Sequence, residues 1–211
     1  MPGVNRHVHF NGKASPASSS SSWPSSGGPI TPPPTYGYVP PHYPLHPTAE
    51  SNGFVNPVLS PNNPTFDFNL TKPPTSMMDY ASIPVSIWQQ PATSPPVPSM
   101  AVVCEQLPWI LNIPGNIQFG YVSVGDLVFG LYKALSTPVS QSEFLTLSPR
   151  GQHAVSKAFK NRCKVCFDSD EYRTEFSQGV KRVDFLVGFT KFSGVRPDKI
   201  GKWTLLVRAD E

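Results

Sequence analysis

The stretch from Leu107 to Leu135, LPWILNIPGNIQFGYVSVGDLVFGLYKAL, most constrains the fold of this chain. Its first half is rich in apolar and aromatic residues and ends in a Pro-Gly-Asn turn signal, which is typical of a strand followed by a turn. Ser123 is a good helix N-cap, and Asp126, three residues on, resembles the second half of a capping box. Apolar residues then recur at helical spacing. They are Val124, Leu127, Val128, Leu131 and Leu135. The stretch therefore predicts a strand and a capped amphipathic helix on which the rest of a domain can pack. The cap also accounts for Asp126 without a catalytic role.

Composition divides the chain into a tail and a domain. Of the 26 prolines, 21 lie in residues 1–100, and the first 65 residues carry only three charged side chains besides histidine, Arg6, Lys13 and Glu50. A segment so poor in charge and aliphatic residues cannot bury enough apolar surface to offset the entropy of ordering it. We therefore expect a disordered Pro/Ser-rich tail over residues 1–61 and a single domain over residues 62–209.

Further signals along the domain predict its class. Ser140 begins a capping box, and Ser148 followed by proline marks another helix start. Val183, Phe185, Val187 and Phe189 alternate with other residues, so residues 180–192 are expected to form a long strand, and residues 203–207 a final one. Strands, then helices, then strands indicate an α+β fold: a mainly antiparallel sheet with about three helices on one face.

Six segments of the domain together resemble an uncharacterised domain family of fungal proteins, named only as a domain of unknown function. The segments are Phe66-Asp67, residues 91–99, Leu107–Ile110, Val122–Asp126, Arg182–Leu186 and Trp203–Leu205. The resemblance spans roughly residues 62–208 and does not include the tail. It implies a single α+β domain and a fungal source, and it brings no activity, cofactor or binding residue with it.

The tail contains two Pro-Pro-x-Tyr motifs. Their residues are Pro33, Pro34 and Tyr36 in the first motif and Pro40, Pro41 and Tyr43 in the second. This pattern resembles the ligand of WW domains, whose aromatic groove takes a polyproline II segment. The alternative is that a stretch dense in proline and tyrosine produces the pattern by composition alone. A WW-domain protein is the partner that this part of the sequence predicts.

Three cysteines and one histidine are the candidate metal ligands of the domain. Cys163 and Cys166 form a Cys-x-x-Cys pair, which supplies two of the four ligands of a structural zinc site, and Cys104 and His153 would have to complete it. Their spacing matches no zinc module, so structural cysteines and no cofactor are the favoured interpretation. Three cysteines in a chain without a secretion signal indicate a reducing compartment. We expect an intracellular protein, cytoplasmic or nuclear and not bound to a membrane.

Residues 149–164 form a basic helix with no acidic residue. Its cations are Arg150, Lys157, Lys160, Arg162 and Lys164. They would suit phosphates, but four acidic residues follow between 168 and 175 and would be able to fold back on the helix, so a nucleic-acid ligand is the less favoured interpretation.

No GxSxG, HExxH or paired-carboxylate motif is present. The sequence favours a non-enzymatic protein-interaction module. An enzyme whose site assembles only in three dimensions is the alternative.

Overall fold

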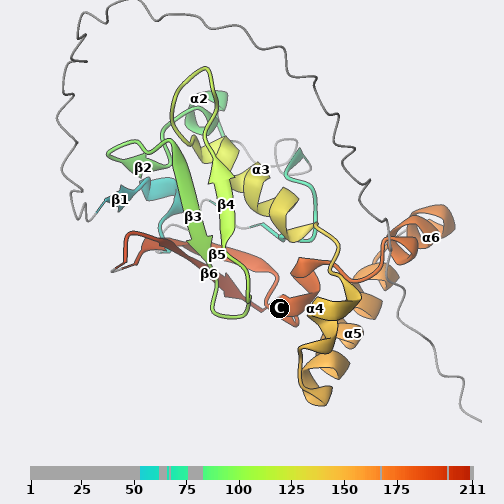
Figure 1. Ribbon diagram of the computed structural model, residues 1–211. Coiled ribbons are helices and arrows are strands. Elements are labelled where there is room, and N and C mark those ends of the chain that lie inside the picture. Colours follow the sequence, from blue (N-terminus) through green and yellow to red (C-terminus); the bar gives the residue numbers. More distant parts are fainter. Residues whose placement is uncertain are drawn as a thin grey trace, which may run out of the picture. The chain divides into compact units, whose positions relative to one another are not determined.

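The computed structural model describes residues 53–61, 66, 68–75, 83–166, 168–198 and 200–209 (Figure 1). The Pro-Pro-x-Tyr motifs lie outside these residues. Residues 53–61, which composition groups with the tail, contribute a short strand and a 3-10 helix, and Leu59 is fully buried in the core. The folded part of the chain therefore begins earlier than composition suggests. No helix within the described residues is both long and apolar enough to cross a membrane.

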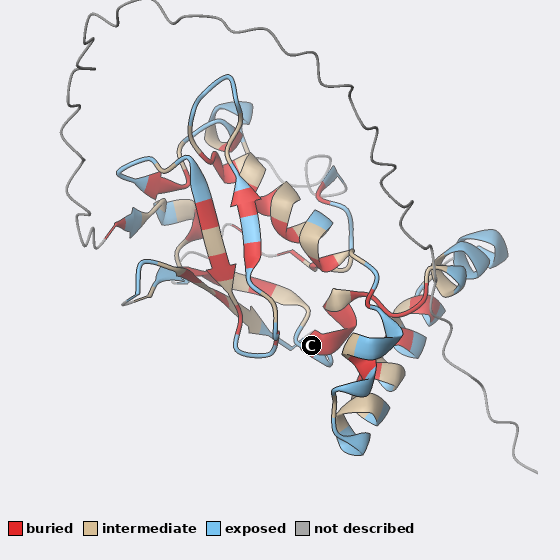
Figure 2. Ribbon diagram, viewed as in Figure 1, coloured by how far each residue is buried: buried red, intermediate tan, exposed pale blue. Residues whose placement is uncertain are grey.

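A four-stranded sheet forms the centre of the domain. Its strands are β3 (Ser99–Val103), β4 (Leu111–Pro114), β5 (Lys191–Pro197) and β6 (Trp203–Arg208). They are ordered β4-β3-β6-β5, and only the central β3–β6 pair is parallel. A second, two-stranded sheet pairs β1 (Phe54–Val55) with β2 (Thr93–Ser94). Buried and less buried residues alternate along β3 and β4 (Figure 2), as expected of strands with one face on the core. The predicted α+β class with a mainly antiparallel sheet is confirmed.

Helix α3 (Val124–Leu135) begins where the sequence predicts. The Ser123 Oγ accepts a hydrogen bond from the Asp126 backbone N–H at 3.0 Å, and the Asp126 carboxylate accepts one from the Ser123 backbone N–H at 3.0 Å. This is a complete capping box, which satisfies two backbone donors at the helix start. All five apolar residues predicted to form the inner stripe are buried. Asp126 therefore acts as a cap, as expected.

The remaining helices are short, except for one. They are α2 (Val85–Trp88), α4 (Gln141–Leu145), α5 (Pro149–Lys164), α6 (Ser169–Ser177) and the 3-10 helices η1 (Pro57–Leu59) and η2 (Arg182–Leu186). The predicted capping residues Ser140 and Ser148 begin α4 and α5. Helix α3 packs along β4, whereas α5 packs mainly on η2 and α6, and these two helices lie together to one side of the sheet (Figure 1). Helix α3 thus lies on the sheet, while α5, α6 and η2 form a helical layer beside it.

The strand predicted over residues 180–192 is wrong. Residues Arg182–Leu186 form η2, and the strand β5 begins only at Lys191 and continues through Pro197, past the end of the predicted strand. The alternating pattern misleads because Val183 through Leu186 are all buried, so alternation does not mark an inner and an outer face. Val187 then adopts a left-handed conformation with φ 47°, and Gly188 follows at φ 90°, which interrupts any extended chain. The final strand, predicted over residues 203–207, is confirmed as β6.

A close approach between α3 and β4 fixes how the helix lies on the sheet. A Cβ added at Gly130 would lie 2.7 Å from Ile113 Cγ2 and 3.0 Å from Ile113 Cδ1. Ile113 is itself buried in the core, so it has little room to move aside. Gly130 therefore permits a helix–strand distance that a larger residue would prevent.

We predict opposite effects for the same substitution at two helical glycines. Gly151→Ala in α5 meets only ordinary contacts, the nearest at 3.4 Å, and should stabilise the domain by up to ~1 kcal/mol through helix propensity. Gly130→Ala gains the same propensity, but overpacking against Ile113 should reverse the sign and give a net loss of about 1–2 kcal/mol. Chemical denaturation of both variants measures the difference, and a stabilised Gly130→Ala variant would contradict the tight packing.

Candidate functional site

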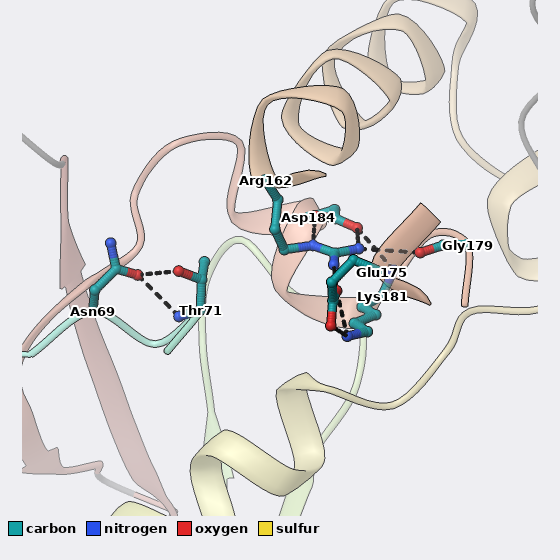
Figure 3. Close-up of polar contacts among 7 residues, drawn as sticks. All are labelled: Asn69, Thr71, Arg162, Glu175, Gly179, Lys181 and Asp184. Carbon is teal, nitrogen blue, oxygen red and sulfur yellow. Dashed lines mark hydrogen bonds and ion pairs between the residues drawn. The ribbon is translucent and has the colours of Figure 1, made fainter. Parts of the chain in front are cut away.

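Four charged side chains meet where α5, α6 and η2 come together. We call Arg162, Glu175, Lys181 and Asp184 the ionic cluster, and Figure 3 shows them pointing toward one another. Arg162 comes from α5, Glu175 from α6, and Asp184 from η2, while Lys181 immediately precedes η2. Lys181 and Asp184 are 8% and 3% exposed. It is the most extensive group of charges removed from water in the described part of the chain, which makes it the first place to look for chemistry.

Arg162 is held on three sides. Its Nε and Nη2 donate to the two carboxylate oxygens of Asp184 at 2.8 and 3.0 Å, and Nη2 also donates to the Gly179 carbonyl at 3.1 Å. Its Nη1 donates to the Glu175 carboxylate. A bidentate arginine–carboxylate pair combines charge with a fixed planar geometry, so the guanidinium has one defined orientation.

Lys181 completes the cluster from the other side of Glu175. Its Nζ lies 2.9 and 2.8 Å from the two carboxylate oxygens of Glu175. The Lys181 backbone N–H donates to Asp184 Oδ2 at 2.8 Å, so the same residue contributes to both acids. Two positive and two negative charges therefore balance, and each buried charge has an opposite partner, as burial demands.

The electrostatics of the cluster oppose a reactive group. Burial, the largest effect on Arg162, lowers its pKa, but the hydrogen bond and charge of Asp184 together with the charge of Glu175 outweigh it, so the pKa is raised. Burial raises the pKa of the neighbouring Cys163 thiol to about 11, although the Arg162 charge opposes this. A thiol with so high a pKa is protonated at neutral pH and is a poor nucleophile and a poor metal ligand. Cys163 thus behaves as a packing residue.

The polar atoms of the cluster bind one another. In the part of the chain that is described, every buried side-chain nitrogen and oxygen has a hydrogen-bond partner. The Asp184 carboxylate accepts from Arg162 through both of its oxygens, so it is engaged within the fold. The arrangement instead fastens α5 and α6 to the turn that leads into β5.

A second polar contact joins α4 and η2 through Trp109, which lies two residues before β4. Its Nε1 donates to Glu143 Oε1 at 2.9 Å, and the Arg182 guanidinium lies 4.9 Å from the centre of its ring. The Phe185 ring meets it edge-on at 4.8 Å between centroids. Glu143 is also the acid of the α4 capping box, so one carboxylate holds both a helix start and the indole. Two of the segments that carry the family resemblance, Leu107–Ile110 and Arg182–Leu186, therefore meet in space.

The structure does not bring the four candidate metal ligands together in a metal site. Cys104 is buried and its Sγ donates to Gln106 Oε1 at 2.9 Å, Cys163 is buried in α5, Cys166 is half-buried just beyond that helix, and His153 is exposed on it. Within the described residues, no group of three or more His, Cys, Asp and Glu side chains is arranged to hold a metal ion. The six tail residues, Pro33, Pro34, Tyr36, Pro40, Pro41 and Tyr43, lie outside the described residues.

Sequence reasoning missed the ionic cluster. Asp184 was assigned to a strand, so its pairing with Arg162, 22 residues earlier, had no local signal. One signal was available. The acids after the basic helix were expected to be able to fold back on it, and Glu175 does so by pairing with Arg162. Nothing in the sequence indicated that Lys181 would share this acid.

A family model described as "Family of unknown function (DUF6699)" matches residues 66–202, which cover most of the described domain. No curated protein and no solved structure matched this chain.

We predict that the ionic cluster contributes strongly to stability. Arg162→Met would leave Asp184 buried without its cation, and breaking a buried pair in this way costs about 3–5 kcal/mol. Arg173→Met is the matched control, since Arg173 pairs with Asp170 at 3.5 Å and both side chains are 80% exposed. Loss of such an exposed pair should cost less than ~1 kcal/mol. Chemical denaturation compares the two, and similar losses would show that the cluster is not special.

A pH dependence follows from the capping box of α4. Hydrogen bonds from the backbone and side chain of Ser140 lower the pKa of Glu143 below its ordinary value of 4.5, and the Trp109 bond adds to this. Because the folded-state pKa is the lower one, the stabilisation is present above pH 4.5 and is lost as the pH falls through the folded-state value. Glu143→Gln removes it. The difference in free energy of unfolding between wild type and this variant should be largest at about pH 6 and should decrease as the pH is lowered toward about 3. A gap that does not change with pH would contradict the assignment.

Proposed function

We propose that this chain, which belongs to the DUF6699 family of unknown function, is a non-enzymatic protein-interaction module whose tail binds WW domains. The observation that carries the proposal is the internal pairing of the ionic cluster. Its carboxylates are taken up by Arg162 and Lys181, and the adjacent Cys163 is held as a thiol. The most extensive buried polar assembly of the described residues thus serves the fold, which leaves interaction through the surface and the tail.

The tail supplies the recognition chemistry in this proposal. In Pro33-Pro34 and Pro40-Pro41 the proline rings hold φ near the polyproline II value before binding, so little backbone entropy is lost on docking. Tyr36 and Tyr43 each offer an aromatic body with a hydroxyl at its end, which suits a single pocket of a WW domain. The partner would be a WW-domain protein, such as a ubiquitin ligase with several such domains, and the two proteins would bind inside the cell. The resemblance of the domain segments also supports a fungal source.

The spacing of the two motifs favours competition over joint binding. Seven residues of proline-rich chain span at most ~22 Å in the polyproline II conformation. This is short for two folded WW domains side by side, so the motifs would act as alternative sites for one domain. Each contact is small, and the expected dissociation constant is on the order of 10–100 μM.

A peptide titration tests this function. We expect peptide 29–48 to bind a tandem WW-domain protein, as followed by isothermal calorimetry, with Tyr36→Ala and Tyr43→Ala each causing about a twofold loss or less, as redundant sites require. The double substitution should abolish binding. The matched control keeps both tyrosines and replaces Tyr38, which lies between the motifs and belongs to neither. Binding that persists unchanged in the double variant would show that the motifs are products of composition.

A further inference from the structure

The outer side of α5 carries a row of cations. We define the basic stripe as Arg150, Lys157, Lys160 and Lys164, with His153 lying between the first two, and all five side chains are exposed. Their spacing of three and four residues places them on one side of the helix, within an arc of about 80° at the α-helical rotation per residue. Over the 14 residues from first to last, the stripe is about 21 Å long.

The opposite side of α5 fixes the direction in which the stripe faces. Val155, Phe159 and Cys163 are buried, and Phe159 packs on Phe176 of α6 with ring centroids 5.5 Å apart. Arg162, the fifth cation of α5, lies off the stripe and points into the ionic cluster. The helix therefore cannot rotate to hide the stripe, and its cations remain directed at solvent.

The stripe is not neutralised by the described part of the chain. None of its four cations makes an ion pair there. The acids that follow the helix were the reason to discount it on sequence grounds. Two of these four acids are taken by other cations: Glu175 is bound by Arg162 and Lys181, and Asp170 pairs with Arg173.

Helix stability does not account for the stripe either. The first turns of α3, α4 and α6 contain acidic residues, which suit the positive end of a helix, whereas α5 has none and places Arg150 there. Like charges three and four residues apart, as at Lys157, Lys160 and Lys164, repel one another. Lys164 at the far end is favourable, but the row as a whole works against the isolated helix. An external anion would remove that repulsion.

We propose that the basic stripe binds the phosphate backbone of double-stranded nucleic acid. A duplex presents a regular, dense array of phosphate anions. A straight row of exposed cations about 21 Å long, on one side of α5, can lie along that array. The arc carries no apolar side chain that could enter a lipid layer, which disfavours a membrane surface. It carries no aromatic ring on which unpaired bases could stack, which disfavours single strands. Binding should be independent of sequence, because phosphate contacts alone carry no base information.

The test is the salt dependence of binding by the full chain to a fluorescein-labelled 20-base-pair DNA duplex, measured by fluorescence anisotropy. Four phosphate contacts predict a slope of about −3.6 in log K against log salt. Lowering sodium chloride threefold should therefore tighten binding about 50-fold. Binding should be weak, with a dissociation constant on the order of 10⁻⁴ M at physiological salt.

Two variants of equal charge decide whether the stripe is responsible. The stripe variant, Lys157→Gln, Lys160→Gln and Lys164→Gln, keeps one cation and should respond only about threefold to the same change of salt. The control removes three exposed cations elsewhere, Lys72→Gln, Lys133→Gln and Arg196→Gln, and should keep the roughly 50-fold response. All six positions are exposed, so both variants should fold, and circular dichroism melting curves verify this.

Three outcomes would overturn the proposal. The first is no change in anisotropy at low salt when the wild-type chain is present at a concentration about ten times the expected dissociation constant. The second is an equal loss of salt response in the stripe and control variants, which would reveal an effect of net charge alone. The third is tighter binding to the single strand of the same sequence, or to phosphatidylserine vesicles, than to the duplex.

Discussion

The pairing of Arg162 with Asp184 is the contact on which the helical layer of this domain depends. Helix α6 has no buried residue of its own, so burial of apolar area alone gives it little reason to form. It is held by Glu175, which reaches the ionic cluster, and by Phe176, whose ring packs on Phe159. Both contacts need α5 in place, and α5 is fixed to η2 through the Asp184 carboxylate. Neutralising this carboxylate with a bidentate guanidinium makes its burial tolerable and positions the layer at once.

The same junction explains which parts of the fold the sequence predicts. Ser123, Ser140 and Ser148 were assigned as helix caps from residues no more than three positions away, and each one caps a helix. Cap chemistry is local, so a sequence pattern carries it fully. The α+β class was accessible for a similar reason, because it depends on the order of elements and not on their contacts.

The segment before β5 was not predictable by the same means. Its alternation of apolar residues is what a strand would show, but here all of Val183 to Leu186 is enclosed, on one side by α5 and Trp109. Only the tertiary contacts make a buried Asp184 acceptable, and a buried acid inside an apolar run has no interpretation until Arg162 is near. The parallel pairing of β3 with β6, about a hundred residues apart, is likewise a property of the assembled sheet. The candidate site was missed because Arg162 pairs with side chains that lie 13 and 22 residues away along the chain. Only the bonds made by Lys181 join residues that are closer in sequence.

These contacts separate the parts of the chain that hold the fold from the parts available to partners. Three segments of the family resemblance stabilise the fold. Val122–Asp126 caps α3, while Leu107–Ile110 and Arg182–Leu186 meet at Trp109. Helix α5 shows the division within one element. Its inner cation Arg162 pairs with two acids, whereas its outer cations form no ion pair within the described residues. A cation placed for stability would be expected to resemble Arg162, in a low-dielectric setting with fixed partners, because exposed pairs contribute little. The outer row has neither feature, and its charge is directed at solvent along the whole helix. Because the outer cations lack the buried setting and fixed partners of Arg162, we assign the basic stripe to a partner outside the domain.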